Sequence, residues 1–251
     1  MKNNEKTHAT KAKSYDIGRP EYPAAFFDFL YNDAAFKTED VIADIGCGTG
    51  KVTRHFLERG NQVIAVEPDI DMLSIANEKL NKYPNYISSL RYADDTFIES
   101  ASIDHIFCGN SYHWFCRKTV VPEFKRILRQ NGTIVIANLG NGINKYDDAL
   151  EKIYKKYVQP ATSVNANTSA PFLSGTFIEK TFDYTVHETL NEFLHGLLSA
   201  SFAPKINTDT YESFCHEIKD LFIKYCKDER LETNMKLSCM IGNADNLAMT
   251  D

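Results

Sequence analysis

The sequence lacks the features that mark membrane-spanning, secreted and metal-binding proteins. Its 251 residues contain no apolar run of about 18 residues, so no segment is predicted to cross a membrane. The first residues, MKNNEKTHATKAKS, have no apolar stretch and are not expected to act as a secretory signal. The six cysteines form no C-x-x-C pair and the seven histidines form no H-E-x-x-H motif, so we predict no metal site. Scattered cysteines of this kind indicate reduced thiols, and we expect a cytoplasmic protein.

Basic charge is also scarce. The chain has 28 Lys and Arg against 34 Asp and Glu, which gives a net charge of −6 and a pI of about 5.7. A broad basic surface for gripping nucleic acid is therefore not expected, and neither nucleic acid nor a membrane is predicted as a partner. The 43% hydrophobic and 25% charged residues are typical of a globular domain with a sizeable core. We expect a monomer or a homodimer.

Short apolar runs alternate with helical patterns along the first half of the chain. The predicted strands are Val41–Ile45, Gln62–Val66, Ile87–Tyr92, Ile103–Cys108 and Thr133–Ala137. The predicted helices are Lys51–Arg59, Ile70–Leu80 and Val120–Leu128, followed by a turn at Asn131-Gly132. Strands that alternate with helices in this way predict βαβ units and a mostly parallel sheet that is covered on both faces.

The second half of the chain has a different order of predicted elements, with fewer strands and longer helices. Its predicted helices are Tyr146–Val158, Thr189–Ala200 and Tyr211–Tyr225, and its predicted strands are Lys180–Val186 and Met235–Ile241. The stretch Gln159–Ser174 is rich in Pro, Asn, Thr and Ser, which is typical of a loop or lid. The two late strands are expected to add a hairpin-like pair to the edge of the sheet.

The strongest local signal is DIGCGTG, from Asp44 to Gly50, which follows a predicted strand and opens a predicted helix. Glycines let the backbone turn tightly and approach a ligand closely, and a helix N-terminus offers free N–H groups. Glu67 ends the next strand, where a carboxylate accepts both hydrogen bonds of a ribose diol. We therefore expect an adenosine-type ligand at the carboxyl ends of the first two strands.

Three families place glycines at such a corner. The dinucleotide fingerprint G-x-G-x-x-G/A fits Gly46 and Gly48 but meets Lys51 at its third position. A P-loop needs a hydroxyl residue after its lysine, whereas Lys51 is followed by Val52. The remaining pattern, D-x-G-C-G-x-G with an acid on the second strand, resembles motif I of the class I S-adenosylmethionine (SAM)-dependent methyltransferases. A NAD-dependent oxidoreductase and a non-catalytic SAM-binding module stay open as alternatives.

Further segments match the same family in chain order. Ala93-Asp94-Asp95 resembles the acidic motif that contacts adenine, and Asn110–Phe115 (NSYHWF) resembles a variant of motif IV. Residues Tyr15–Pro23 follow Y-x-x-x-R-P-x-Y-P, which resembles the entry segment of the type-11 and trans-aconitate-methyltransferase-like group acting on small molecules. The resemblance covers nearly the whole chain and is more specific for fold and cofactor than for substrate.

The resemblance implies an α/β, Rossmann-like fold with a seven-stranded, mostly parallel sheet, one antiparallel edge strand and added helices that cover the site. Within this single domain, residues 1–36 would cover the cofactor, 37–140 would form the SAM-binding core, and 141–251 would supply substrate-cover helices and the last two strands. The implied reaction transfers a methyl group from SAM to a small-molecule O, N or carboxylate acceptor and leaves S-adenosylhomocysteine (SAH).

The resemblance also implies site residues. Those for the cofactor are Tyr15, Arg19, Asp44, Gly46, Cys47, Gly48, Glu67, Pro68, Met72, Asp94, Asp95 and Asn110. Those for the substrate are Tyr22, His113 and Trp114, with His113 also the candidate catalytic residue.

Several of these assignments have an alternative. Asp44 would hold the amino-acid end of SAM or only cap the following turn, and Met72 would cover the adenine or belong to the core. Asp95 competes with Asp94 for the adenine contact. Arg19 would clamp the carboxylate of SAM, together with Tyr15, or form a surface ion pair.

The role of His113 also has two interpretations. A methyl transfer needs a base only if the acceptor must lose a proton, which a histidine near neutrality accepts well. The other reading is that His113 shapes the pocket together with Trp114.

Overall fold

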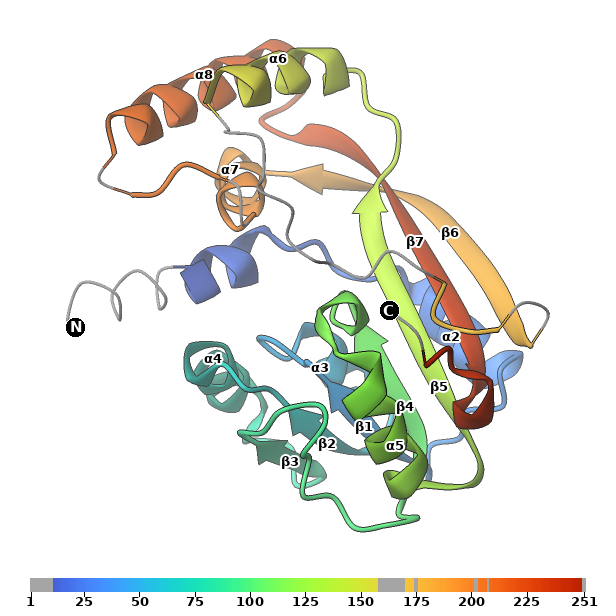
Figure 1. The fold of residues 1–251 in the computed structure, drawn as a ribbon. Helices are drawn as coiled ribbons and strands as arrows, with labels where there is room; N and C mark the ends of the chain where they lie inside the picture. The colour runs from blue at the N-terminus through green and yellow to red at the C-terminus, as the bar shows by residue number, and fades with distance from the viewer. Residues whose placement is uncertain (1–10, 158–169, 174–175, 201–202, 207, 250–251) are drawn as a thin grey trace. The chain divides into compact units, whose positions relative to one another are not determined.

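The computed structural model describes residues 11–157, 170–173, 176–200, 203–206 and 208–249. Most of the predicted loop Gln159–Ser174 lies outside these ranges. The described residues form a seven-stranded sheet in the order β3-β2-β1-β4-β5-β7-β6 (Figure 1). The strands are β1 (Val41–Ile45), β2 (Gln62–Val66), β3 (Tyr86–Ser89), β4 (Ile103–Gly109), β5 (Leu128–Asn141), β6 (Phe177–Glu188) and β7 (Leu231–Asn243). The predicted α/β fold class is confirmed.

Helices connect these strands as the alternating pattern predicts. They are α2 (Ala24–Asn32), α3 (Lys51–Glu58), α4 (Ile70–Leu80), α5 (Arg117–Ile127), α6 (Asp147–Tyr157), α7 (Leu190–Leu198) and α8 (Asp209–Tyr225). Residues 11–18 are also helical, and short 3₁₀ turns occupy η1 (Tyr112–Trp114) and η2 (Ala244–Asn246). The helix α2 was not predicted from the sequence.

Alternating side chains of the central strands build two apolar layers. On β4, Ile106 faces a cluster that contains Phe124 of α5. Its neighbour Phe107 points to the opposite face, where its ring centroid lies 6.2 Å from Phe26 of α2 and 5.4 Å from Phe56 of α3. These side chains are fully buried, and each contributes about 1.5–3 kcal/mol through removal from water. Burial on both faces explains why the sequences of β1 and β4 are almost continuously apolar.

The antiparallel strand differs in position from the prediction. We predicted it at the edge of the sheet, whereas β7 lies between β5 and β6. The Gly142 N–H donates to the Asn234 carbonyl at 2.8 Å, and Ser238 donates to the Asn138 carbonyl at 3.5 Å, so β7 runs opposite to β5. The sequence pattern gives the order of strands along the chain but not their order across the sheet.

The predicted turn at Asn131-Gly132 is a bulge within a longer strand. Ile103 of β4 pairs with Leu128, but His105 pairs with Thr133, so β5 carries extra residues between the two pairs. Asn131 adopts a φ of 68°, the left-handed conformation that asparagine tolerates. A bulge and a tight turn use the same residue types, which is why the sequence pattern predicted a turn.

The described chain divides into two compact units. Unit 1 contains residues 11–20, 140–157 and 183–236, and unit 2 contains residues 21–139, 170–182 and 237–249, apart from the gaps given above. In unit 1, α6, α7 and α8 pack around an apolar cluster that includes Phe193 and Phe214. Among the helices described, none is both long enough and apolar enough to cross a membrane.

Candidate functional site

The loops after β1 and β4 meet at the carboxyl edge of the sheet in unit 2. The strand order reverses between these two strands, and ligands of open α/β sheets bind in the crevice at such a point. Gly46 has a φ of 75°, and a Cβ atom there would lie 2.5 Å from the Cβ of Ser111. The Ser111 hydroxyl in turn donates to the Ile45 carbonyl at 2.7 Å. Only glycine fits this position, which brings the two loops into contact.

Glu67 is held against the Gly-rich loop by backbone groups. One carboxylate oxygen accepts from the Gly48 N–H at 2.9 Å and the other from the Asp69 N–H at 3.0 Å. Burial raises the pKa of Glu67, although these two N–H groups act in the opposite direction. Each oxygen keeps a free lone-pair direction, so the carboxylate is oriented and still able to accept hydrogen bonds from a diol.

Asp44 is almost completely buried next to this carboxylate. Its exposed fraction is 2%, and the hydroxyl of Thr53 on α3 donates to it at 2.6 Å. Burial raises the pKa of Asp44 to about 7, the hydrogen bond from Thr53 lowers it, and the charge of Glu67 raises it further. The carboxylate is therefore in a place that favours a cationic partner.

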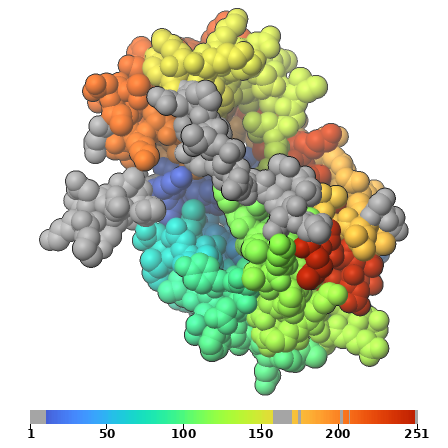
Figure 2. Space-filling view, viewed as in Figure 1, coloured from blue at the N-terminus to red at the C-terminus, as the bar shows by residue number. Residues whose placement is uncertain are grey.

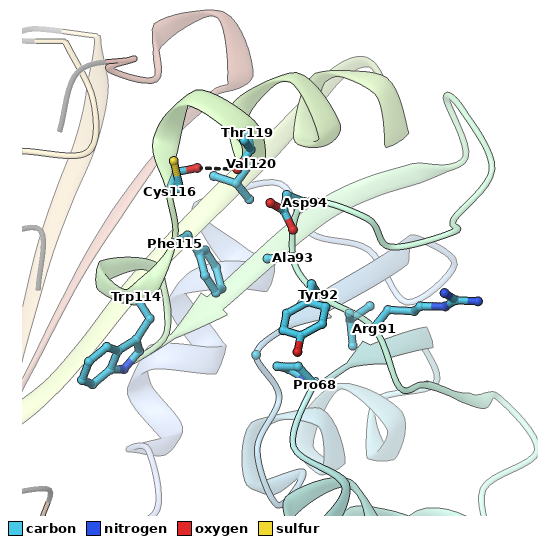
Figure 3. Close-up of a pocket in the computed structure, with 12 residues that line it drawn as sticks. Pro68, Arg91, Tyr92, Ala93, Asp94, Trp114, Phe115, Cys116, Thr119 and Val120 are labelled. Carbon is cyan, nitrogen blue, oxygen red and sulfur yellow. Dashed lines mark hydrogen bonds between the residues drawn. The ribbon is translucent and has the colours of Figure 1, made fainter. Parts of the chain in front are cut away.

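A cavity of about 390 Å³ opens beside the Gly-rich loop. Residues from the end of β2, from the segments that follow β1, β2, β3 and β4 and from the start of α5 line it: Gly46, Val66, Pro68, Arg91, Tyr92, Ala93, Asp94, Trp114, Phe115, Cys116, Thr119 and Val120. Figure 3 shows Pro68 and Tyr92 on one side, Phe115 and Trp114 on the other, and the Asp94 carboxylate between Ala93 and Val120. Apolar walls with one carboxylate suit a flat ring that carries an amino donor.

The cavity lies where the segment after β3 adjoins the start of α5. Both segments contribute to the green surface in the lower half of Figure 2, and the Thr96 N–H and hydroxyl both bind Glu123 of α5, at 3.0 and 2.5 Å. The pair of bonds fixes the loop that carries Asp94 against the helix. Asp95, the rival of Asp94, is not among the residues that line the cavity and forms a bridge with Tyr92 instead.

Of the predicted site residues, Gly46, Pro68, Asp94 and Trp114 line this cavity. Gly48 and Glu67 are brought together beside it by the hydrogen bond described above. Sequence reasoning missed Arg91 and Tyr92, whose only signal is that they directly precede Ala93-Asp94.

Two predicted residues, Tyr22 and Asn110, bind each other. The Tyr22 hydroxyl donates to the Asn110 side-chain oxygen at 2.9 Å, while that oxygen also accepts from the Leu139 N–H at 3.0 Å. The Asn110 amide nitrogen donates to the Leu139 carbonyl at 3.0 Å. The Tyr22 ring is buried against Phe26, at 5.6 Å between centroids. This arrangement uses most of the hydrogen-bonding capacity of Asn110 for fixing the end of β4 to β5.

The remaining predicted residues lie in other settings. Met72 is half-buried on α4, off the buried stripe of Leu73, Ala76 and Leu80. Burial and the charges of Asp44 and Glu67 raise the pKa of the Cys47 thiol. Tyr15 and Arg19 belong to unit 1, whereas the cavity belongs to unit 2.

His113 and Trp114 form the 3₁₀ turn η1 that follows β4. Their ring centroids are 4.9 Å apart, His113 is half-buried, and 58% of Trp114 is exposed. The ring of Phe115 continues from this turn into the cavity (Figure 3). Within the described ranges, no group of three or more His, Cys, Asp or Glu side chains is arranged to hold a metal ion.

Comparison with known sequences shows similarity to methyltransferases. Residues 43–136 match a family described as methyltransferase domain. An uncharacterized methyltransferase-like protein of Schizosaccharomyces pombe is 26% identical over 223 residues, which is 86% of each chain. An uncharacterized methyltransferase of Mycobacterium tuberculosis is 33% identical over 121 residues, which is 48% of this chain and 47% of that protein.

Comparison with solved structures shows the same fold. A protein of Anaeromyxobacter dehalogenans, provisionally assigned as a type II methyltransferase, matches with a TM-score of 0.65 at 18% identity, over 90% of this chain and 98% of that one. A phosphoethanolamine N-methyltransferase of Haemonchus contortus, solved with phosphomonomethylethanolamine and SAH, matches with a TM-score of 0.51 at 18% identity, over 93% of this chain and 57% of that one.

Proposed function

We propose that this chain, whose residues 43–136 match the methyltransferase domain, is a SAM-dependent methyltransferase that methylates a small-molecule acceptor on oxygen, nitrogen or a carboxylate. One observation supports the orientation that we propose for SAM. The apolar cavity with Asp94 is lined by Val66 and Pro68, the chain neighbours of the oriented Glu67, and by Trp114 of the turn that holds His113. An adenosyl group in the cavity places its ribose at Glu67 and directs its amino-acid end toward Asp44.

The other cofactor assignments extend this proposal. The ammonium group of SAM neutralises Asp44, whose buried carboxylate accepts a hydrogen bond from Thr53. Arg19 donates two parallel hydrogen bonds to the carboxylate of SAM, because its planar guanidinium suits bidentate binding. Met72 and Pro68 cover the adenine from the side of α4.

The choice of a small acceptor rests on charge and on the aromatic turn. The net charge of −6 gives the protein no bulk attraction for nucleic acid or for an anionic membrane surface. Trp114 and His113 offer a flat aromatic face and one titratable ring, which suits a small acceptor that is oriented by ring contacts. Free thiols at all six cysteines fit a reducing compartment such as the cytoplasm.

The sulfonium of SAM is already a strong electrophile, so the protein mainly orients the acceptor for in-line displacement at the methyl carbon. When bound, SAM would supply the methyl group to the acceptor and keep the electron pair of the broken sulfur–carbon bond, which leaves SAH. His113 takes the acceptor proton where the acceptor is a neutral hydroxyl or an ammonium group.

A labelling experiment tests the acceptor class. The purified full chain is incubated with methyl-labelled SAM and a cell extract that has been separated into small-molecule, RNA and protein fractions. We expect label in the small-molecule fraction alone, and panels of carboxylic acids, phenols and amines then identify the acceptor. Label that appears in RNA or protein, with none in small molecules, would overturn the proposal.

A single variant tests the role of His113. General bases contribute about 10²–10⁴-fold to turnover. If His113 is the base, His113→Ala lowers kcat at saturating acceptor by about 100-fold or more, and the loss is smaller for an acceptor that has no proton to lose. A loss below about tenfold with every acceptor refutes the base and leaves His113 as a pocket-shaping residue.

A further inference from the structure

The turn that carries Asp94 lies at the surface of unit 2. Asp94 and Asp95 are both exposed, and only Asp94 lines the cavity. The Asp95 N–H donates to the Tyr92 carbonyl at 3.2 Å, so the chain reverses direction here. Exposed connecting segments are mobile unless something fixes them. The direction of the Asp94 carboxylate therefore depends on what holds the chain beside it.

Thr96, two residues after Asp94, is the buried anchor of this turn. Only 1% of its surface is exposed, although Phe97 next to it is 71% exposed. The Thr96 hydroxyl donates to Glu123 at 2.5 Å and accepts from the Ile98 N–H at 3.2 Å, while the Thr96 N–H donates to the same Glu123 oxygen at 3.0 Å. Two residues of chain span about 7 Å, so the anchor restricts Asp94 to a short reach.

Glu123 is itself fixed on α5 by Arg126. The Arg126 Nε donates to one carboxylate oxygen at 2.7 Å, and a terminal guanidinium nitrogen donates to the other at 2.8 Å, which is a bidentate arrangement. This pairing and the bonds from Thr96 outweigh burial and lower the pKa of Glu123 to about 2. Glu123 is therefore an ionised and already oriented acceptor for both Thr96 donors at neutral pH.

The helix that holds Thr96 also supplies a wall of the cavity. Thr119 and Val120 line the cavity, and they precede Glu123 by four and three residues on α5. Residues at these spacings share one face of a helix. The bonds between Thr96 and Glu123 therefore tie the turn with Asp94 to the same helix face that lines the cavity.

The other bonds between this loop and α5 lie further along the chain from Asp94. The Arg126 guanidinium donates to the Ser100 hydroxyl oxygen at 3.1 Å, and the Ala101 N–H donates to the Arg126 carbonyl at 2.9 Å. Both attachments follow Asp94 by at least six residues. They hold the far part of the loop against the end of the helix and leave the restraint of Asp94 to Glu123.

We propose that Glu123 is a positioning residue for Asp94, and that by holding Thr96 against α5 it sets the preference of the cavity for a purine that carries a 6-amino group. The inference rests on the proposed function, in which the adenine of SAM occupies this cavity. Neither Glu123 nor Thr96 is among the residues that line the cavity, so both act through Asp94.

The test compares two ligands that differ only at position 6 of the purine. SAH carries the 6-amino group, whereas S-nebularinylhomocysteine has hydrogen in its place. Calorimetric titration of the full chain with each ligand gives the ratio of the two affinities. Because the Asp94 carboxylate accepts a hydrogen bond from the amino group alone, we expect the wild type to bind SAH about tenfold more tightly. A change that merely loosens the fold weakens both ligands alike and leaves the ratio unaltered.

Three variants alter the anchor to different extents. Glu123→Ala removes the acceptor of both Thr96 bonds, and the ratio should fall to within about twofold. Thr96→Val keeps the side-chain shape and the N–H bond but loses the hydroxyl, and the ratio should fall to about threefold. Binding of S-nebularinylhomocysteine to both variants should stay within about twofold of the wild type. Glu123→Gln keeps an oxygen that accepts both bonds and should preserve most of the ratio.

Lys125 on the same helix provides a matched control. Its ammonium group pairs with Asp245 of η2 at 2.9 Å, and neither residue is among those that line the cavity. Lys125→Ala therefore removes an ion pair of α5 without altering the anchor, and its ratio should equal that of the wild type. Asp94→Ala, in contrast, should abolish the ratio.

The outcomes separate the possible failures. A folded wild type that binds neither ligand contradicts the proposed function itself. If the wild type binds both ligands equally, or if Asp94→Ala keeps the ratio, the role of Asp94 is wrong and the positioning role falls with it. If Asp94→Ala abolishes the ratio while Glu123→Ala and Thr96→Val keep it, the positioning role of Glu123 is overturned. If Glu123→Ala does not fold, Thr96→Val decides, because valine keeps the shape of threonine.

Discussion

The substitution Asp44→Asn should make the free protein more stable and the cofactor complex weaker. Burial raises the pKa of Asp44 from 3.8 to about 7 and outweighs the hydrogen bond from Thr53, which lowers it, while the charge of Glu67 makes a smaller contribution that raises it. A carboxyl group whose pKa is raised on folding binds its proton more tightly in the native state than in the unfolded chain. The native state therefore loses stability as the pH rises from about 4 to about 7, and the loss persists above that range.

The magnitude follows from the same numbers. Each pKa unit corresponds to about 1.4 kcal/mol, so the rise from 3.8 to about 7 costs the native state about 4 kcal/mol at pH 8, as an upper limit. Asparagine keeps the shape and accepts the Thr53 hydrogen bond but carries no charge. Its amide protons need partners of their own, which reduces the gain. We expect Asp44→Asn to raise the free energy of unfolding by about 1–3 kcal/mol at pH 8 and by nearly nothing at pH 4.

Cofactor affinity should change in the opposite direction. A hydrogen bond to a charged partner is worth about 1.5–3 kcal/mol, so loss of the Asp44 carboxylate should weaken SAH binding about 10- to 100-fold. In the wild type, the arriving ammonium group favours the ionised carboxylate. Binding near pH 6.5 should then release protons, which calorimetry in two buffers of different ionisation enthalpy detects. Asp44→Asn should lose that release.

Urea unfolding of the free protein between pH 4 and pH 8.5 measures the stability difference. Asp104 on the neighbouring strand β4 is the matched control. Its carboxylate accepts from the Val41 N–H at 2.8 Å and pairs with Arg129, and these contacts outweigh burial and lower its pKa. Asp104→Asn should therefore destabilise the protein at neutral pH. A free Asp44→Asn protein that is less stable than the wild type at pH 8 would refute the argument, and unchanged SAH affinity would refute the cofactor role.

Four other substitutions, one of them a control, give independent checks. Asp94→Ala should weaken SAH binding about tenfold, whereas Asp95→Ala, which alters a residue outside the cavity lining, should stay within about twofold in the same titration. The hydrogen bond with His55 and the charges of Lys51 and Arg54 outweigh burial and lower the pKa of Glu21 to about 2, so its stabilisation is present above pH 4.5 and lost as the pH falls toward 2. Glu21→Gln should consequently cost less than about 1 kcal/mol at pH 7, because the pair is half exposed, and nothing at pH 2, as measured by urea unfolding. Burial lowers the pKa of His105 despite its contact with Asp40, so stability should fall as the pH drops below 6.5, and His105→Gln should flatten that part of the curve.

The elements that sequence reasoning predicted well are those with a single dominant signal. The ranges Val41–Ile45, Gln62–Val66 and Ile70–Leu80 agree with β1, β2 and α4. Each is an apolar run or a helical stripe that ends at a turn residue or begins after an N-cap, here Asp69, whose side chain accepts from two N–H groups. Pattern, propensity and tertiary packing all favour the same structure there, so a short window of sequence is enough.

The prediction of strand bounds was less accurate where apolar residues line a cavity or lie on the surface. The range Ile87–Tyr92 was expected as the third strand, but β3 ends at Ser89, and Leu90 and Tyr92 are 50% and 69% exposed. Tyr92 lines the cavity instead of pairing in the sheet. A hydrophobic pattern records that a residue is apolar, and it does not distinguish burial in the core from contact with a ligand.

The candidate site combines several features that a stable apolar core avoids, namely buried carboxylates and positive φ angles. Asp44 and Glu67 are two buried carboxylates whose pKa values are raised, and they lie beside Gly46, Gly48 and Gly50, which all have positive φ. In a site that only had to be stable, an apolar residue in place of Asp44 would fold better. The charges are understandable if a cation completes them, and SAM brings two, the ammonium and the sulfonium.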